Sequence, residues 1–279
     1  MHLQYTKKNG HGGISKHYRD LLDRLHQERQ APFTPEEIAS AWQMEPIRVR
    51  RLLAHWASLG WLSRLRRGLY VVVPLGTRHP ADLSEDPWMI AHRLFAPCYI
   101  GGWSACEHWG LTEQIFRGVV VFTTHKVHNR TPTIKETSYI IKTIPEEHMF
   151  GTTGIWRRET KVQVSTPART IADLLNDPAI GGGMRHVAEI VERFFLGEHR
   201  DETGLLEAMA HLNNRTMYKR LGYLAETLKL NAPGALRLCH ERLSAGYSVL
   251  DPTVNAQGPF VRRWMLRINV SLTPGGSAA

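Results

Sequence analysis

Three arginines in one short stretch are the residues whose types and spacing point most directly to a chemistry. Arg48, Arg50 and Arg51 lie in PIRVRRLLAHWASLGW, residues 46–61, which turns apolar after the arginines and reaches a glycine at position 60. If the stretch is helical, each residue advances by about 100°, and the arc facing the core holds Leu52, Leu53, Trp56 and Leu59. The arginines then span the opposite arc.

The side chains between the arginines decide how closely the helix backbone can approach another surface. The exposed ridge continues through Ala54, His55 and Ser58. Small side chains there let a helix lie deep in the major groove of DNA, where arginines reach phosphates or guanine edges and Ala54 can contact a thymine methyl group. The stretch therefore predicts a DNA-recognition helix, although a run of arginines is also typical of a basic, solvated helix face.

Further basic residues gather around this stretch and favour the DNA hypothesis. The segment after it adds Arg64, Arg66 and Arg67, and the N-terminal arm adds Lys7, Lys8 and Lys16. Residues 1–80 hold 13 Lys and Arg against 6 Asp and Glu, so this quarter of the chain carries most of the formal net charge of +9. If about six cations neutralise phosphates, the logarithm of DNA affinity falls against the logarithm of salt concentration with a slope of about −5.

The elements that must position these arginines can be read from local signals. A first helix is predicted from about Ser15, with an apolar stripe at Tyr18, Leu21, Leu22 and Leu25. Thr34 and Glu37 have capping-box spacing, and Pro35 and Pro46 each fit the first position of a further helix. The third helix is expected to end at Leu59, before Gly60, and a hairpin turning at Arg66, Arg67 and Gly68 follows it. This order predicts a winged helix-turn-helix over residues 15–74.

The rest of the chain predicts a larger, mixed domain. We expect a mobile basic arm at 1–14, a linker at 75–87, a C-terminal domain at 88–272 and a disordered tail at 273–279. Strands are predicted in PCYIGG, GVVVFTTH, TSYIIKTI and TKVQVS, and helices in PWMIAHRLF, in TPARTIADLL and in a helical series from Met184 to Ala245. The predicted fold class is α+β, with a helical C-terminal part.

Composition restricts the classes of protein to be considered. The chain has 279 residues, with 42% hydrophobic and 22% charged residues, which are ordinary globular values. The three cysteines are too few and too scattered for a disulfide scaffold or a zinc motif. The chain shows no signal peptide, and no apolar run approaches the roughly 20 residues of a membrane span. We expect a cytoplasmic protein that has no membrane partner.

A metal-dependent nuclease is the main alternative of a different class. Glu159 and Lys161 form the Glu-x-Lys half of a nuclease signature, but the chemistry also needs an upstream carboxylate, usually Asp, to share a divalent cation. No aspartate lies between Asp86 and Asp173, and Glu146 and Glu147, which could substitute, sit in a turn-like PEEHMFG. We interpret Glu159 and Lys161 as a charged pair that begins a strand.

The remaining reactive residue types have ordinary structural interpretations. His125 and His128 are interpreted as solvent-facing loop residues without further metal ligands nearby, and Cys98 and Cys106 as core residues. Arg169 and Asp173 have the spacing of a helix-stabilising pair. With no glycine-rich phosphate loop either, the sequence predicts a protein that is not an enzyme and binds no cofactor or metal.

Four segments together resemble the AbiEi family of antitoxins from bacterial abortive-infection systems. They are RRGLYVV after the third helix, YIGGWSACEHWGLTEQ at 99–114, PARTIADLL at 167–175 and RLGYLAE at 220–226, and the resemblance covers roughly residues 16–230. Family members often carry an acidic residue before Arg169, where this chain has Ala168. The segment beyond about residue 230 matches nothing in that pattern.

The resemblance implies an antitoxin that also represses its own promoter. Its N-terminal winged helix-turn-helix would bind operator repeats in double-stranded DNA, and its C-terminal domain would counteract a nucleotidyltransferase-like toxin, directly or indirectly. A winged-helix repressor whose second domain senses a small ligand is a third hypothesis beside the antitoxin and the nuclease.

Overall fold

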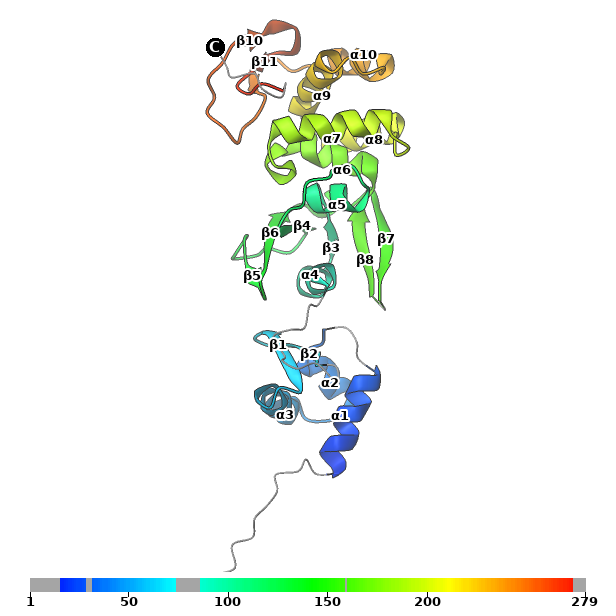
Figure 1. Ribbon diagram of the computed structural model, residues 1–279, viewed down its shortest axis with the longest axis vertical. Helices are drawn as coiled ribbons and strands as arrows, with labels where there is room; N and C mark the ends of the chain where they lie inside the picture. The colour runs from blue at the N-terminus through cyan, green and yellow to red at the C-terminus, as the bar shows by residue number, and fades with distance from the viewer. Residues whose placement is uncertain (1–15, 29–31, 74–85, 159, 273–279) are drawn as a thin grey trace, which may run out of the picture. The chain divides into compact units, whose positions relative to one another are not determined.

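A computed structural model of the chain describes residues 16–28, 32–73, 86–158 and 160–272. The chain divides into two compact units, Met1–Glu85 and Asp86–Ala279, called unit 1 and unit 2 (Figure 1). The predicted arm, most of the predicted linker and the predicted tail lie outside the described residues, as do Lys7, Lys8 and Glu159.

The described residues of unit 1 form three helices followed by a two-stranded hairpin. The elements are α1 (Lys16–Glu28), α2 (Pro35–Trp42), α3 (Pro46–Ser58), β1 (Leu62–Arg66) and β2 (Leu69–Val72). Helix α2 begins with the predicted capping box, in which the Glu37 amide donates to Thr34 Oγ1 at 3.3 Å and the Thr34 amide donates to Glu37 Oε2 at 2.9 Å. Both bonds satisfy amides that a helix start leaves unpaired.

The turn of the hairpin is shorter than predicted, and a third segment pairs with β2. Arg66 pairs with Leu69, so the turn consists of Arg67 and Gly68 alone and does not include Arg66. Gly68 has a φ of +77°, a backbone conformation that glycine adopts without steric cost. Phe33 forms an antiparallel bridge with Tyr70, each amide donating to the other's carbonyl oxygen, which fastens the start of α2 to the hairpin.

The core of unit 1 lies between the three helices and the hairpin. It is built from Leu25, Phe33, Ile38, Ala39, Val49, Leu52, Leu53, Trp56, Leu62, Tyr70 and Val72. Leu59 is an exception to the predicted apolar arc, because its side chain is 47% exposed. Helix α3 ends at Ser58, and Leu59 is its C-cap at the margin of the apolar arc, beyond the last turn that packs on the core.

Unit 2 is built on a six-stranded mixed sheet. Its strands are β3 (Cys98–Ile100), β4 (Gly118–Thr123), β5 (Thr133–Ile134), β6 (Thr137–Thr143), β7 (Thr152–Arg157) and β8 (Thr160–Ser165). They lie in the order β5-β6-β4-β3-β8-β7. The β4–β6 and β3–β8 pairs are parallel and the other pairs are antiparallel. The two outermost strands, β5 and β7, are the ones that the sequence pattern did not predict.

Helices cover both faces of this sheet (Figure 1). The α-helices described in unit 2 are α4 (Pro87–Phe95), α5 (Gly102–His108), α6 (Pro167–Asn176), α7 (Met184–Leu196), α8 (Glu202–Leu212), α9 (Arg215–Thr227) and α10 (Pro233–Glu241), the last of which packs on α9. Helix α4 packs on β3, β4 and β8, whereas Tyr99, Val120 and Phe122 of the sheet join the core formed by α6 to α9. Thr166 caps α6 and Pro167 opens it, as predicted.

A short stretch of β structure follows α10. It contains β9 (Ser248–Val249), β10 (Phe260–Val261) and β11 (Leu266–Arg267), which form a small sheet, and a 3-10 turn at Arg262–Trp264. Two other 3-10 turns lie earlier in unit 2, at Glu146–His148 and Pro178–Gly181. Trp264 is fully buried against α9, so this segment belongs to the core of unit 2. Among the helices that the structure describes, none has the length and apolar composition that crossing a membrane requires.

The junction between β3 and α5 depends on a glycine. Gly102 begins α5 with a φ of +54°, and a Cβ atom at this position would lie 2.7 Å from the Ile180 carbonyl oxygen. Side chains larger than hydrogen are therefore excluded there by both conformation and space. The glycine pair at 101–102 allows α5 to leave the sheet and pack directly on the 3-10 turn before α7.

Candidate nucleic-acid interface

Helix α3 presents its basic face to solvent. Its apolar face is buried through Val49, Leu52, Leu53 and Trp56, of which Trp56 is 1% exposed. The opposite face is exposed at all the positions predicted to contact DNA: Arg48, Arg50, Arg51, Ala54, His55 and Ser58. The helical phase deduced from the sequence is thus confirmed over residues 48–58, with Leu59 as the exception.

A groove between α1 and α3 runs along one side of this face. It is lined by Tyr18, Glu45, Ile47, Arg48, Arg51, Leu52 and His55. The ring of Tyr18 meets that of Trp56 edge to face, with centroids 6.5 Å apart, so Tyr18 of α1 forms one wall of the groove. Among the described residues, neither Arg48 nor Arg51 forms an ion pair, and both guanidinium groups can contact a ligand.

A second groove lies on the other side of α3, between the start of α2 and the hairpin. It is lined by Pro35, Glu36, Arg50, Arg64, Arg67, Gly68 and Tyr70. Here Arg50 is held by Glu36, with its Nη2 atom 2.6 Å and its Nε atom 3.1 Å from Glu36 Oε1. The three arginines that were predicted on the helix are therefore not equivalent, because two face the α1 side and the third is paired on the hairpin side.

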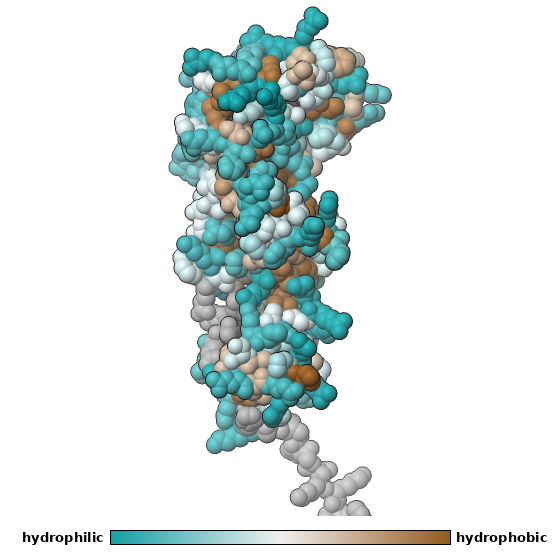
Figure 2. All heavy atoms as spheres, turned by 180° about the vertical axis from the view of Figure 1, so that it is seen from behind, coloured by the Kyte–Doolittle hydropathy of each residue, from teal (hydrophilic) through white to brown (hydrophobic). Residues whose placement is uncertain are grey.

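The other predicted contact residues lie on the same unit. Arg64, Arg66 and Arg67 are exposed on the hairpin, and Lys16 is exposed in the first turn of α1. The strand pairing shifts between Arg64 and Arg66, which is typical of a bulge that redirects side chains. The surface of both units seen in Figure 2 is largely hydrophilic, with smaller apolar areas between the polar groups.

Sequence reasoning missed two residues of this surface. Ile47 is 53% exposed in the first turn of α3 beside Arg48, and the same 100° spacing that placed the arginines would have placed it on their face. Glu36 could not have been found this way, since it is 14 positions from Arg50 and belongs to another helix. The basic surface of unit 1 therefore also contains an exposed isoleucine and an acidic residue.

The structure describes only part of the rival nuclease signature. Lys161 lies on β8, Glu146 and Glu147 lie on an exposed 3-10 turn, and Glu159 is outside the described residues. His125 and His128 are exposed in the loop after β4, as predicted. Within the described ranges, no three His, Cys, Asp or Glu side chains are grouped so that they could hold a metal ion.

The cysteines predicted to be core residues are buried. Cys98 and Cys106 are 4% and 0% exposed. Burial raises the pKa of the Cys98 thiol to about 12 and that of Cys106 further. Both thiols are therefore protonated near neutral pH and are poor nucleophiles.

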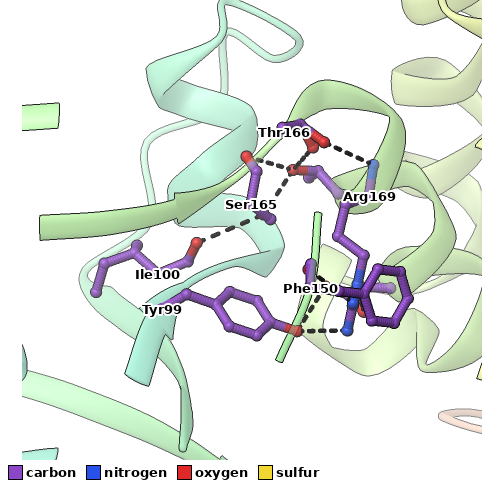
Figure 3. A network of polar contacts seen from close by, with 8 residues as sticks. Tyr99, Ile100, Phe150, Ser165, Thr166 and Arg169 are labelled. Atoms are coloured by element: carbon purple, nitrogen blue, oxygen red, sulfur yellow. Dashed lines mark hydrogen bonds and ion pairs between the residues drawn. The ribbon is translucent and has the colours of Figure 1, made fainter. Parts of the chain in front are cut away.

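The pair Arg169 and Asp173 proves to be the centre of a buried polar network, and Figure 3 shows how Arg169 lies beside Tyr99 and Phe150. Arg169 Nε donates to Asp173 Oδ1 at 3.0 Å, Arg169 Nη2 donates to the Tyr99 hydroxyl at 2.8 Å, and that hydroxyl donates to Asp173 Oδ2 at 3.0 Å. The guanidinium also donates to the Phe150 carbonyl oxygen at 2.9 Å and stacks on the Phe150 ring. The network joins β3, α6 and the segment before β7.

The side chains of this network are closed to solvent. Tyr99, Arg169 and Asp173 are each at most 2% exposed. Burial raises the pKa of Asp173 to about 6, and the neighbouring Arg169 guanidinium opposes that shift. Burial also raises the pKa of Tyr99 well above its usual value. These groups are shielded from solvent, and their hydrogen bonds join three segments of unit 2.

Two further buried cations, both on α9, fasten the C-terminal segment. The Lys219 ammonium donates to the Gly246 carbonyl oxygen at 2.7 Å, and Arg220 donates to the carbonyl oxygens of Leu250 at 3.0 Å and Leu175 at 2.7 Å. The two bonds from Arg220 are buried, so they satisfy carbonyl oxygens that water does not reach. Arg220 in this way links the end of α6 to the segment after β9.

Comparison of the chain with protein-family models found no matching family, and comparison with curated proteins found no significant match.

Proposed function

We propose that this chain is a DNA-binding antitoxin and autorepressor. In this proposal unit 1 is a winged helix-turn-helix domain that binds operator repeats in the chain's own promoter. Unit 2 counteracts a nucleotidyltransferase-like toxin, directly or indirectly. The observation that carries the DNA-binding part is the fully exposed basic face of α3, flanked by the arginines of the hairpin.

The order and packing of the elements support this assignment. A capped α2, a short turn and α3 precede an antiparallel hairpin, and the bridge between Phe33 and Tyr70 ties the hairpin to the start of α2. In a helix-turn-helix the second helix enters the major groove, and here that helix is α3. The exposed small residues Ala54 and Ser58 leave its backbone free to approach base edges.

Charge assigns different tasks to different residues. Arg48 and Arg51, together with Ile47, form the part of α3 suited to contact bases, because a guanidinium can bind guanine and an apolar side chain can contact a thymine methyl group. Arg64, Arg66, Arg67 and Lys16 supply phosphate contacts, which give affinity without sequence preference. If cations of the predicted N-terminal arm raise the number of phosphate contacts to about six, the logarithm of affinity should fall against the logarithm of salt concentration with a slope of about −5.

The antitoxin part of the proposal comes from the family resemblance. Three segments that carry the resemblance contact one another in unit 2: Tyr99 in the first bonds to Arg169 and Asp173 in the second, and Arg220 in the third bonds to the Leu175 carbonyl oxygen in the second. Residues that resemble a family pattern therefore build one common framework. This supports a shared architecture for the domain.

A binding titration tests the DNA-binding part. Arg51→Ala should weaken binding to a duplex from the chain's own promoter by about tenfold or more, because a base or phosphate contact is lost. Arg193→Ala is the matched control, since Arg193 lies on α7 of unit 2 in an exposed pair with Glu113. Equal losses for the two variants would contradict the assignment of α3.

Growth experiments test the antitoxin part and separate it from its rivals. Co-expression with the adjacent gene should rescue growth if that gene encodes a toxin. A protein that instead cleaves plasmid DNA with Mg²⁺ or Mn²⁺, and loses this activity in Glu159→Ala, would be a nuclease. A repressor released by a small ligand, without rescue of growth, would support the ligand-sensing alternative.

A further inference from the structure

The ion pair between Glu36 and Arg50 places an acidic group inside an otherwise basic groove. Glu36 lies in the first turn of α2, and the groove around it contains Arg50, Arg64 and Arg67. The Glu36 and Arg50 side chains are 55% and 59% exposed, so both remain open to a ligand while they are bonded to each other. The pair is thus part of the surface that unit 1 would turn toward DNA.

An acid at this position has an electrostatic cost when DNA approaches. Phosphates repel a carboxylate, and a surface selected only for affinity would carry no acid there. The Glu36 carboxylate is ionised near neutral pH, and the hydrogen bond from Arg50 lowers its pKa further. The pair also restricts Arg50 to one orientation, whereas a free arginine would follow the nearest phosphate.

The other groove provides an internal comparison. It also contains an acid, Glu45, beside Arg48 and Arg51. Within the described residues, however, Glu45 forms no ion pair with either arginine. Arg50 is consequently the arginine of α3 whose direction is set by a partner in the protein before DNA binds.

We propose that Glu36 is a specificity-determining positioning residue: it keeps the Arg50 guanidinium from the phosphates and directs it toward a base edge of the operator. The inference rests on the proposed DNA-binding function and deepens it. Glu36 itself touches Arg50 and is assigned no direct contact with a base. Its effect is to lower binding to unrelated sequences more than binding to the operator.

The test measures affinity for two duplexes, one from the promoter of the chain's own gene and one with the same bases shuffled. In Glu36→Gln, binding to the shuffled duplex should tighten, and its salt slope should steepen by about 0.9, because Arg50 then neutralises one more phosphate. The ratio of promoter to shuffled affinity should fall by about tenfold, as expected when one directed base contact is lost.

Further variants separate the positioning of Arg50 from a general change of charge. In Arg50→Ala the ratio of promoter to shuffled affinity should already be low, and adding Glu36→Gln to this variant should lower the ratio no further. Glu45→Gln removes the same charge from the other groove, and it should raise both affinities while leaving their ratio unchanged. Glu36→Asp keeps the charge on a shorter side chain and should retain part of the ratio. Thermal unfolding of each variant checks that unit 1 stays folded.

The outcomes distinguish this inference from the proposed function. If the wild-type chain prefers the promoter and Glu36→Gln keeps the full ratio, the role of Glu36 is overturned and the DNA-binding proposal stands. An equal fall in Glu45→Gln would also overturn the role of Glu36. A wild-type chain that binds both duplexes equally would overturn sequence-specific binding and this inference with it.

Discussion

The buried Arg169 guanidinium balances the charge of Asp173 and donates hydrogen bonds to three segments of unit 2. It bonds to Asp173, to the Tyr99 hydroxyl and to the Phe150 carbonyl oxygen. A buried pair of this kind is costly to break, since removal of one partner leaves the other without compensation. The exposed pair Arg193 and Glu113, by contrast, is worth about 1 kcal/mol or less.

Arg169→Met should therefore lower the free energy of unfolding of unit 2 by about 3–5 kcal/mol at neutral pH. Urea denaturation measures this loss, and Glu113→Gln serves as the control because it breaks an exposed ion pair of the same unit. A loss as small as that of Glu113→Gln would mean that the buried network contributes nothing beyond packing.

The same variant has a defined pH dependence. Asp173 has a folded-state pKa of about 6 against a usual value of 3.8, so it holds its proton more tightly in the folded chain. Its contribution to stability is then present at low pH and is lost as the pH rises through about 6. Because Arg169 opposes the upward shift, Arg169→Met raises this pKa further, and the loss extends to higher pH. Arg169→Met should therefore lower the free energy of unfolding more at about pH 8 than at about pH 5. An equal loss at both pH values would contradict this explanation.

At the scale of elements, the start of α2 connects folding to the surface that we propose to bind DNA. The capping box of Thr34 and Glu37 fixes the turn that carries Glu36, and the Phe33 bridge holds the same turn against β2. A helix of eight residues is marginal without such support. Local order at this one turn therefore determines where the Glu36 carboxylate meets Arg50.

Thr34→Ala should lower the free energy of unfolding of unit 1 by about 1 kcal/mol, because the Glu37 amide loses its acceptor. Ser40→Ala, at an exposed position within the same helix, should change it by less than about 0.5 kcal/mol. Thermal unfolding monitored by circular dichroism measures both. Similar values for the two variants would show that the cap adds no stability.

At the scale of the whole molecule, the two units have separate cores. The core of unit 1 is centred on Trp56, Phe33 and Leu25, and the large core of unit 2 joins the sheet to α6–α9 and Trp264. We therefore expect each unit to unfold as a unit of its own.

Calorimetry of the full chain should then show two unfolding transitions. Thr34→Ala should shift only the transition of unit 1 and Arg169→Met only that of unit 2. Promoter DNA, which in our proposal binds unit 1, should raise the midpoint temperature of the unit 1 transition alone. A single transition that both substitutions lower equally would show that the units unfold as one.

Local signals in the sequence determined much of unit 1 and several elements of unit 2. Thr34, Glu37 and Pro35 define the start of α2 because a cap involves only neighbouring residues. The phase of α3 followed from the spacing of Leu52, Leu53 and Trp56, and this placed the arginines on the exposed face. Strands β3, β4, β6 and β8 were predicted from runs of apolar and β-branched residues.

Only the tertiary structure decided what depends on residues far apart in the chain. Strand β7 carries a weak pattern and is a strand because β8 pairs with it along its whole length. Tyr99 bonds to Asp173 across 74 positions, and Arg50 bonds to Glu36 across 14. Helical periodicity gives the direction of a side chain from its own helix but not the group that it meets. The sequence thus showed where the basic face lies, and the packing of α2 against α3 decided which arginine is held by an acid.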